Sequence, residues 1–320
     1  MSEVVKREAI SIVVPCYNEE AVFPYLQKAL SALADSIVHD YDVEIILVDD
    51  GSRDATWEKI RAFSAMDSRV RGVSLSRNFG HQAALTCGYD MATGDAVVCM
   101  DADLQDPPDV VLEMIRRWRE GADVVYGVRA SREGETAFKL WTAQLFYRLI
   151  QAMGATDVRE DSGDFRLLSR RSLEALKKMR EEHRFIRGMV GWIGFRTVEV
   201  SYARKARIAG MTKYPFRKML LFALNAIVSF SSFPLRLAYV MAFGLSAMLM
   251  GYLVYTFCMH VFYHVELVPG WTSLILSIMA FGTINLFCLG IIGEYVGRIY
   301  EQSKRRPLYL IGEDTHWFRR

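Results

Sequence analysis

Two long stretches without a charged side chain set the strongest limit on how this 320-residue chain can fold. Leu237 to Met259 and Trp271 to Gly293 contain no Asp, Glu, Lys or Arg. At ~1.5 Å of rise per residue, a helix of either length crosses a hydrocarbon core of ~30 Å. Helices buried in a soluble core rarely lack charge for so long. We therefore predict two transmembrane helices, at about 235–262 and 271–293, within a membrane segment 234–300.

Basic residues flank this membrane segment on its outer sides. The loop from His264 to Gly270 has no Lys or Arg, whereas basic side chains precede the first stretch and follow the second: Arg204, Lys205, Arg207, Lys213, Arg217, Lys218, Arg236, Arg298, Lys304, Arg305 and Arg306. By the positive-inside rule, both termini are expected in the cytosol, with residues 301–320 as a cytosolic tail. The apolar run ending at Pro15 is too short for the core of a signal peptide.

Residues 211–233, just ahead of the membrane segment, carry apolar side chains at helical spacing. These are Phe216, Met219, Leu220, Ala223, Leu224 and Ile227, and they lie beside Arg217 and Lys218. The pattern predicts an amphipathic juxtamembrane helix lying along the membrane surface. An ordinary packed helix fits the same spacing.

Composition excludes several classes of protein. Lys and Arg number 39 against 37 Asp and Glu, so a nucleic-acid binder that relies on bulk positive charge is not expected. The five cysteines are scattered, form no CxxC pair and leave one over, which argues against a disulfide framework and against a zinc site.

Within residues 1–210, short apolar runs of strand type alternate with helical patterns. The runs are Ile10 to Pro15, Val43 to Val48, Val70 to Leu75, Ala96 to Met100 and Val124 to Tyr126. Such alternation predicts an α/β domain with a mainly parallel sheet. Asp106 before Pro107 predicts the start of a helix that runs to Arg119.

Three of these runs end in acidic sequences: PCYNEE at 15–20, DDGS at 49–52 and DADLQD at 101–106. Ligands of parallel sheets bind beyond the carboxyl ends of the strands, so the acidic ends are expected to face one crevice. Unpaired carboxylates would repel one another there. Mg²⁺ or Mn²⁺ would relieve the repulsion, and Asp101, Asp103 and the Gln105 amide oxygen could share it with a diphosphate. A lone DxD is usually a surface turn, but its place at a strand end favours a metal site.

Four motifs in this domain resemble the family 2 glycosyltransferases with a GT-A fold: VVPCYNEE (13–20), LVDDGSRD (47–54), SRNFGHQAAL (76–85) and MDADLQDPP (100–108). Three later motifs, GDFRL (163–167), GMTKY (210–214) and IGEYVGRIYEQSKRRP (292–307), narrow the resemblance to polyprenyl-phosphate glycosyltransferases. Bactoprenol glucosyltransferases of the GtrB type look nearest, and dolichyl-phosphate mannose synthases more distant. The resemblance runs from about residue 10 to 310 and implies that residues 1–210 form a cytosolic GT-A domain.

The resemblance implies an inverting transferase of a bacterial inner or plasma membrane. It would move a sugar, with glucose favoured, from a UDP-sugar to undecaprenyl phosphate on the cytosolic face, giving a lipid-linked sugar for cell-envelope glycans such as lipopolysaccharide. A homo-oligomer is also expected. The implied contacts to the nucleotide sugar are Pro15, Tyr17, Glu19, Val48, Asp49, Asp50, Asp101, Ala102, Arg129 and Lys213.

On the acceptor side, Asp164 matches the position of a presumed base, where it could remove a proton or steer the acceptor; a loop cap is the plainer interpretation. Arg166 could hold the acceptor's phosphate together with Lys213 and Arg217, or it could form an internal ion pair with Asp161 or Asp164. Asp103 and Arg166 complete the predicted catalytic set. His81 is interpreted as structural.

Three alternatives stay open at this point. A mannose synthase that uses GDP-mannose would share the fold, and a non-catalytic lipid-binding or flipping subunit could keep it for binding alone. A processive polysaccharide synthase resembles a family that needs a QxxRW motif and more membrane helices, and this chain has neither.

Overall fold

The computed structural model describes residues 7–129, 162–182, 184–203, scattered positions between 243 and 262, and residues 270–316. These residues fall into two units. The first unit holds the described residues up to 203 together with 306–316, and the second holds those from 243 to 305. Each unit is described by itself.

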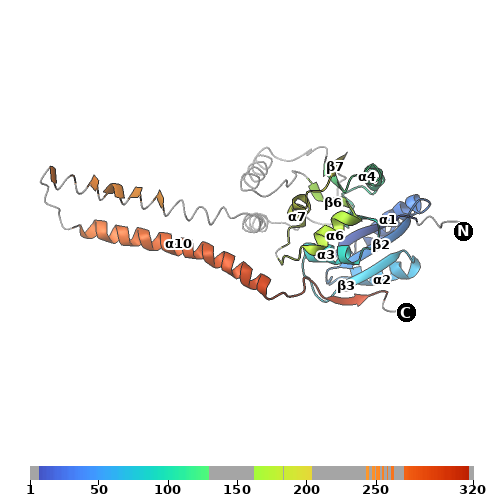
Figure 1. Ribbon diagram of the computed structural model, residues 1–320. Helices are drawn as coiled ribbons and strands as arrows, with labels where there is room; N and C mark the ends of the chain where they lie inside the picture. Colours follow the sequence, from blue (N-terminus) through green and yellow to red (C-terminus); the bar gives the residue numbers. More distant parts are fainter. Residues whose placement is uncertain are drawn as a thin grey trace. The chain divides into compact units, whose positions relative to one another are not determined.

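The first unit is built around an eight-stranded mixed sheet with the strand order β7-β5-β6-β4-β1-β2-β3-β8 (Figure 1). Its strands are β1 (Ala9–Cys16), β2 (Asp42–Asp49), β3 (Val70–Leu75), β4 (Ala96–Cys99), β5 (Val124–Arg129), β6 (Ser162–Ser169), β7 (Thr197–Tyr202) and β8 (Ile311–Asp314). β4, β1, β2 and β3 run parallel, and so do β5 and β7. β6 is antiparallel to both β4 and β5. The α/β prediction and its five strands are confirmed, whereas β6, β7 and β8 were not predicted.

Helices cover both faces of the sheet. They are α1 (Phe23–Ile37), α2 (Thr56–Met66), α3 (His81–Met91), α4 (Val110–Arg119), α6 (Arg170–Lys178) and α7 (Ile186–Trp192). Successive strand side chains point to opposite faces, so Ile10, Ile12 and Val14 of β1 share a core with α1, α2 and α4. Val13 points the other way, and a Cβ added to Gly88 of α3 would lie 2.2 Å from its Cγ1 atom. The sheet is thus held rigidly between two helical layers.

The helix predicted to start at Pro107 begins later, at Val110. Asp106 is buried and accepts a hydrogen bond from the Tyr202 hydroxyl of β7, so it does not cap the helix. The predicted start of this helix was wrong because the Asp106 carboxylate, which the sequence pattern predicted to cap the helix, binds the Tyr202 hydroxyl instead.

The predicted tail, residues 301–320, contains ordered elements instead. Residues 301–303 end a long helix, and β8 pairs antiparallel with β3 at the edge of the sheet. The buried Asp314 carboxylate accepts from Arg71 Nη2 at 2.6 Å, and the Gly72 amide donates to Thr315 Oγ1 at 3.0 Å. β8 was not predicted because IGED is too short and too polar to be recognised as a strand, and the cytosolic location of this tail stays a prediction.

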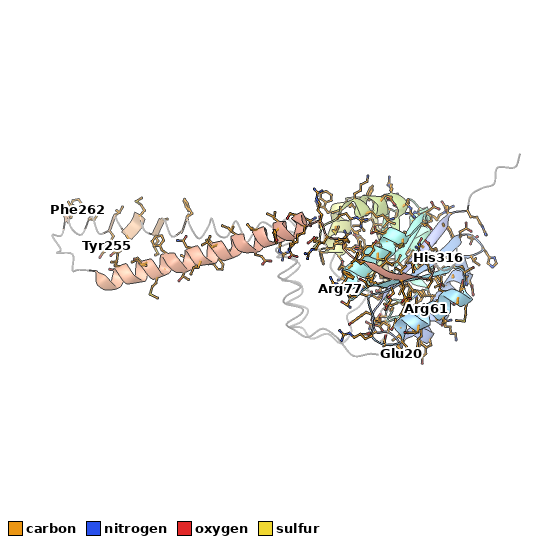
Figure 2. All side chains as sticks on the ribbon, turned by 90° about the horizontal axis from the view of Figure 1, so that it is seen from below. Glu20, Arg61, Arg77, Tyr255, Phe262 and His316 are labelled. Carbon is orange, nitrogen blue, oxygen red and sulfur yellow. The ribbon has the colours of Figure 1, made fainter. Side chains whose placement is uncertain are left out.

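The described residues of the second unit are helical apart from Gly270 and the turn that begins at Lys304. α10 (Trp271–Ser303) begins where the second apolar stretch was predicted to begin, but it continues past Gly293 with a Glu294–Arg298 ion pair of 2.9 Å on its surface. Large apolar side chains are exposed along α10 and at Tyr255 and Phe262, which are labelled in Figure 2.

Within the described residues, one helix is long and apolar enough to cross a membrane: Ser277–Ser303, with a mean hydropathy of 1.5. This helix is compatible with a membrane association. The predicted juxtamembrane helix at 211–233 lies outside the described residues.

Candidate active site

The loops that follow β1 and β2 are joined by hydrogen bonds. The Asp50 amide donates to the Cys16 carbonyl at 2.9 Å, the Asn18 amide donates to Ser52 Oγ at 2.9 Å, and the Glu19 amide donates to Thr56 Oγ1 at 2.9 Å. Asn18 itself adopts a left-handed φ of 52°. The two strand ends therefore form one connected surface at the carboxyl edge of the sheet.

The two carboxylates at the end of β2 are buried and bonded internally. Asp49 is 1% exposed and accepts from the Ser52 amide at 3.2 Å and from Ser74 Oγ at 2.9 Å. Asp50 is 3% exposed and accepts from the amides of Phe79 at 2.8 Å and Gly80 at 3.0 Å. Burial raises the pKa of Asp50, and the two amides lower it in part. Asp50 thus fixes the loop at Phe79 and Gly80, and Asp49 ties the turn at Ser52 to β3, while their predicted contact with a nucleotide stays a prediction.

Gly51 allows the loop at Arg77 and Asn78 to pack closely against the end of β2. Its φ is +65°, and a Cβ at this position would lie 2.5 Å from the carbonyl carbon of Arg77. Any other residue would be strained and would also push the loop away. The DDGS sequence therefore holds the loop that contains Arg77 against the end of β2.

The other residues predicted for the nucleotide pocket lie around the same strand ends. Pro15 pairs with Val48 in the β1–β2 register, and both are buried, whereas Tyr17 is exposed. The structure thus brings together the residues of β1, β2 and the loops after them that were predicted to line the nucleotide pocket. Arg129 ends β5 as predicted, but its side chain lies outside the described part, as do Lys213 and Arg217.

The end of β4 is more open. The Asp101 side chain is 36% exposed, while Ala102 and Gln105 are buried beside it. Leu104 adopts a left-handed φ of 54°, and Asp103 Oδ1 accepts from the Gln105 amide at 3.1 Å, which fixes the turn. Desolvation raises the pKa of Asp101 to about 6, with Asp164, Asp106 and Asp103 adding to the increase and His81 opposing it.

Asp164 of β6 is the centre of a charged cluster. Its Oδ1 atom accepts from Arg166 Nη2 at 2.9 Å and from Arg187 Nε at 3.1 Å, and its Oδ2 atom lies 3.1 Å from both Arg187 Nη2 and His81 Nε2. Burial alone would raise the pKa of Asp164, but Arg187, His81 and Arg166 outweigh it and hold the pKa well below its usual range. A carboxylate that protonates so weakly is a poor base, so the geometry favours the steering role.

Arg166 lies in the middle of the sheet, paired with Cys99 of β4 and Tyr126 of β5, and it is fully buried. Of the two roles left open for it, the internal ion pair with Asp164 is present. Its Nε and Nη1 atoms have no hydrogen-bond partner among the described residues.

Two members of this cluster were not predicted. His81 opens α3 and was interpreted as structural, yet its Nε2 atom lies 3.1 Å from Asp164 and 3.9 Å from Asp101 Oδ1. Arg187 belongs to the short helix α7 and was not singled out. The contacts of His81 and Arg187 with Asp164 join distant parts of the chain, so the local sequence does not reveal them. The one local hint for His81 is its position directly after Gly80, whose amide donates to Asp50.

The predicted metal ligands were tested against this geometry. Within the described residues, no three His, Cys, Asp or Glu side chains are grouped so as to hold a metal ion. Mg²⁺, however, is usually bound through only one or two carboxylates together with substrate phosphates and water. Asp101 and Asp103 supply two carboxylates on one strand end, and one of them is open to solvent. The residues present fit a divalent cation of that kind.

Comparison with known proteins identifies the class. The model of glycosyl transferase family 2 matches residues 11–177. An uncharacterized glycosyltransferase, YkcC of Bacillus subtilis (strain 168), is 45% identical over 94% of this chain and 92% of its own length. More remotely, a crystal structure of glucosyl-3-phosphoglycerate synthase from Mycobacterium tuberculosis aligns with 69% of this chain and 78% of its own, at 21% identity and a TM-score of 0.48. The chain belongs to glycosyl transferase family 2.

Two further relatives carry more specific names. The bactoprenol glucosyl transferase of Shigella phage SfV is 40% identical over 94% of this chain and 97% of its own length. The prophage bactoprenol glucosyl transferase homolog of Escherichia coli (strain K12) is 39% identical over 94% and 98%. Both matches extend well beyond the family domain into the apolar C-terminal part.

Proposed function

We propose that this chain transfers a glucosyl group from a nucleotide sugar to polyprenyl phosphate at a membrane surface. The observation that carries the proposal is the near-full-length similarity, at about 40% identity, to proteins named bactoprenol glucosyl transferases. This similarity includes the segment of α10, whose exposed apolar side chains suit a lipid environment.

The donor is proposed to be a UDP-sugar, with its base and ribose over the joined ends of β1 and β2. Tyr17 is exposed there and can cover a base, while Pro15 and Val48 form the buried floor. Asp101, Asp103 and Gln105 would hold Mg²⁺ or Mn²⁺ beside the diphosphate. When bound, such an ion supplies positive charge that offsets the charge on the leaving diphosphate.

The acceptor is a phosphate monoester, which is already anionic near neutral pH because its second pKa is about 6. Its oxygen forms a bond to the anomeric carbon while the bond from that carbon to the diphosphate breaks, and the electron pair leaves with the nucleoside diphosphate. In-line displacement inverts the anomeric carbon. The reaction therefore needs orientation and neutralisation more than proton removal, which agrees with the low pKa of Asp164. Arg129, Lys213 and Arg217 stay proposed phosphate contacts.

A two-span topology with cytosolic termini is part of the proposal. The antiparallel pairing of β8 with β3 supports this topology, because two paired strands lie on the same side of a membrane. A chain that returns to its own side crosses an even number of times. If α10 is one crossing, the stretch from Leu237 to Met259 supplies the other. A bacterial inner membrane and a homo-oligomer complete the proposal.

The test is to offer the purified protein a panel of UDP- and GDP-sugars with undecaprenyl phosphate and to weigh the lipid product by mass spectrometry. A hexosyl lipid formed from UDP-glucose supports the proposal. A product from GDP-mannose alone would indicate a mannose synthase. No product from any donor, with lipid binding retained, would support the non-catalytic alternative.

The topology has its own test. A cysteine introduced at Val265 or Val268 should react with an impermeant reagent added outside intact cells, and one at Ser303 should not. The reverse labelling would contradict the cytosolic placement.

A further inference from the structure

The chain that follows α10 adds the last strand at the β3 edge of the sheet, shown in red beside β3 in Figure 1. Residues 309–315, which contain this strand, are called the strap here. Within the strap, β8 pairs with β3 from Val73 to Leu75, and the Leu310 carbonyl accepts from the Ser76 amide at 2.8 Å. The strap therefore borders the end of β3 and the first residue of the loop at 76–80.

The same stretch of chain, residues 74–80, holds the acidic end of β2 on its other side. The Ser74 hydroxyl donates to Asp49 at 2.9 Å, and the Phe79 amide donates to Asp50 at 2.8 Å. In the strand order β2-β3-β8, the strap and the end of β2 thus lie on opposite sides of this stretch. A displacement of the strap would therefore be passed on to the surface over which the base and ribose of the donor are proposed to lie.

Gly312 is the point of closest approach between the strap and the loop. The register between β3 and β8 shifts at Ser74 and Leu75, so that Gly312 has no paired residue in β3. A Cβ at Gly312 would lie 3.2 Å from the Cα atom and 3.4 Å from the N atom of Ser76. These are backbone atoms, so the start of the loop would have to move to admit a side chain. Gly312 does not have a positive φ, so alanine would bring no backbone strain of its own.

Tyr309 fixes the strap to the helix that follows the loop. Its hydroxyl donates to Asp90 Oδ2 at 2.8 Å, and the guanidinium of Arg180 binds both oxygens of the same carboxylate at 2.7 and 2.9 Å. Asp90 belongs to α3, which begins at His81, directly after the loop. The strap thus contacts the chain on both sides of the loop, at Ser76 before it and at α3 after it.

We propose that the strap positions the loop at 76–80 and thereby sets the affinity of the site for the nucleotide sugar, with Gly312 and Tyr309 as its positioning residues. This inference rests on the proposed function. The strap acts through the loop and the end of β2, not on the reacting atoms. A change that weakens the binding of substrate and transition state equally raises KM and leaves kcat unchanged. Variants of the strap are therefore expected to affect the binding of the donor and not the transfer step.

The experiment measures kinetics and binding on the full chain in detergent. Gly312→Ala should raise the donor's KM by about 10-fold, since a misplacement of ~1 Å can cost ~100-fold and the shift required here is smaller. The dissociation constant for UDP in the presence of Mn²⁺, measured by calorimetry, should rise in step, while kcat and the acceptor's KM stay within about 2-fold. Gly312→Val, with a larger side chain, should raise the donor's KM further.

Tyr309→Phe is the milder variant, because it keeps the ring and removes one hydrogen bond to Asp90. It should raise the donor's KM by about 3-fold, again without a change in kcat. It also keeps the proposal testable if the Gly312 variants do not fold, which their melting temperatures would show.

Asp314→Asn is the matched control. It removes the ion pair with Arg71 at the other end of the strap, away from Ser76, so it should lower stability and leave the donor's KM within about 2-fold. An equal rise in the donor's KM in Asp314→Asn and Gly312→Ala would show a general loss of stability and overturn the proposal. Unchanged UDP binding in Gly312→Ala and Tyr309→Phe would overturn it too, as would a fall in kcat at an unchanged donor KM.

The proposed function can fail without the strap proposal failing. If the wild-type protein transfers no sugar to polyprenyl phosphate, the proposed function is wrong, and the binding of UDP and of GDP to the wild type and the variants still decides whether the strap positions a nucleotide site. A wild-type protein that binds neither nucleotide would overturn both.

Discussion

The acidic residues at the ends of β2 and β4, two strands of the same sheet, differ in burial and in hydrogen bonding. At the end of β2, Asp49 and Asp50 are almost fully buried and accept hydrogen bonds from nearby amides and a hydroxyl. At the end of β4, Asp101 is more than one-third exposed, and its pKa is raised. An acidic strand end can therefore be closed by internal hydrogen bonds or remain open for a ligand, depending on whether amides and hydroxyls lie within reach of its carboxylates.

The largest effect is expected at the open end. Asp103→Ala should reduce sugar transfer by roughly 1000-fold, because neutralisation of the leaving group is among the largest contributions to such a reaction. Asp101→Asn should do the same and yet leave the melting temperature unchanged or higher, because Asp164, Asp106 and Asp103 repel the charge of the wild-type carboxylate. Transfer assays and thermal melts on the same preparations check both parts. Turnover like the wild type in either variant would contradict the assignment of the open end.

Gly51→Ala should disturb the closed end of β2. The positive φ and the 2.5 Å approach to Arg77 predict a loss of about 3 kcal/mol in the free energy of unfolding. Gly194→Ala is the matched control, because Gly194 has nearly the same positive φ of +67° but a Cβ there would come no closer than 3.9 Å to a neighbouring atom, the Trp192 carbonyl oxygen. Its loss should be about 1 kcal/mol. Equal losses measured by denaturant unfolding would show that the close approach does not matter.

Asp49→Ala should cost about 1 to 3 kcal/mol, since it leaves the Ser52 amide and the Ser74 hydroxyl without their acceptor. Asp49→Ala should thus lower stability, whereas Asp101→Asn should not. Denaturant unfolding of the two variants side by side gives the result. A more stable Asp49→Ala protein would mean that the end of β2 tolerates an unpaired donor.

A third acidic strand end gives the smallest effect, and it depends on pH. Burial raises the pKa of Asp314 in β8, but Arg71 and the His316 amide outweigh it, so its pKa in the folded protein is lowered. A lowered pKa contributes stability that is present above the unfolded value of about 3.9 and is lost as the pH falls through the folded value. Asp314→Asn should therefore cost about 1 kcal/mol at pH 6, and the cost should shrink as the pH falls below about 3.9 toward the lowered pKa of the folded protein. A pH-independent difference in unfolding free energy would contradict the ion pair.

The parallel core of the fold could be predicted because each of its strands is a continuous apolar run between helical patterns. β6 could not, because SGDFRLLS carries Asp164 and Arg166 and its place between β4 and β5 depends on pairing with distant strands. β7 and β8 are short and partly polar, so they give no clear local pattern.

The candidate site likewise contains residues that the local sequence predicts and residues that are brought in by contacts between distant parts of the chain. The acidic ends of β1, β2 and β4 follow from local sequence, and the structure brings them to one edge. His81 and Arg187 both contact Asp164, which lies 83 positions after His81 in the chain. Contacts across such separations leave no periodic signal that a single sequence can reveal.

The pairing of β3 with β8 also sets an order of events in biosynthesis. Arg71 and Asp314, which anchor that pairing, are 243 positions apart, and the apolar α10 lies between them. While the ribosome is still making α10, β3 has no outer neighbour and leaves its edge unpaired. This edge of the sheet can be completed only after α10 has been synthesised, so a chain that stops before residue 311 lacks the strand that pairs with β3.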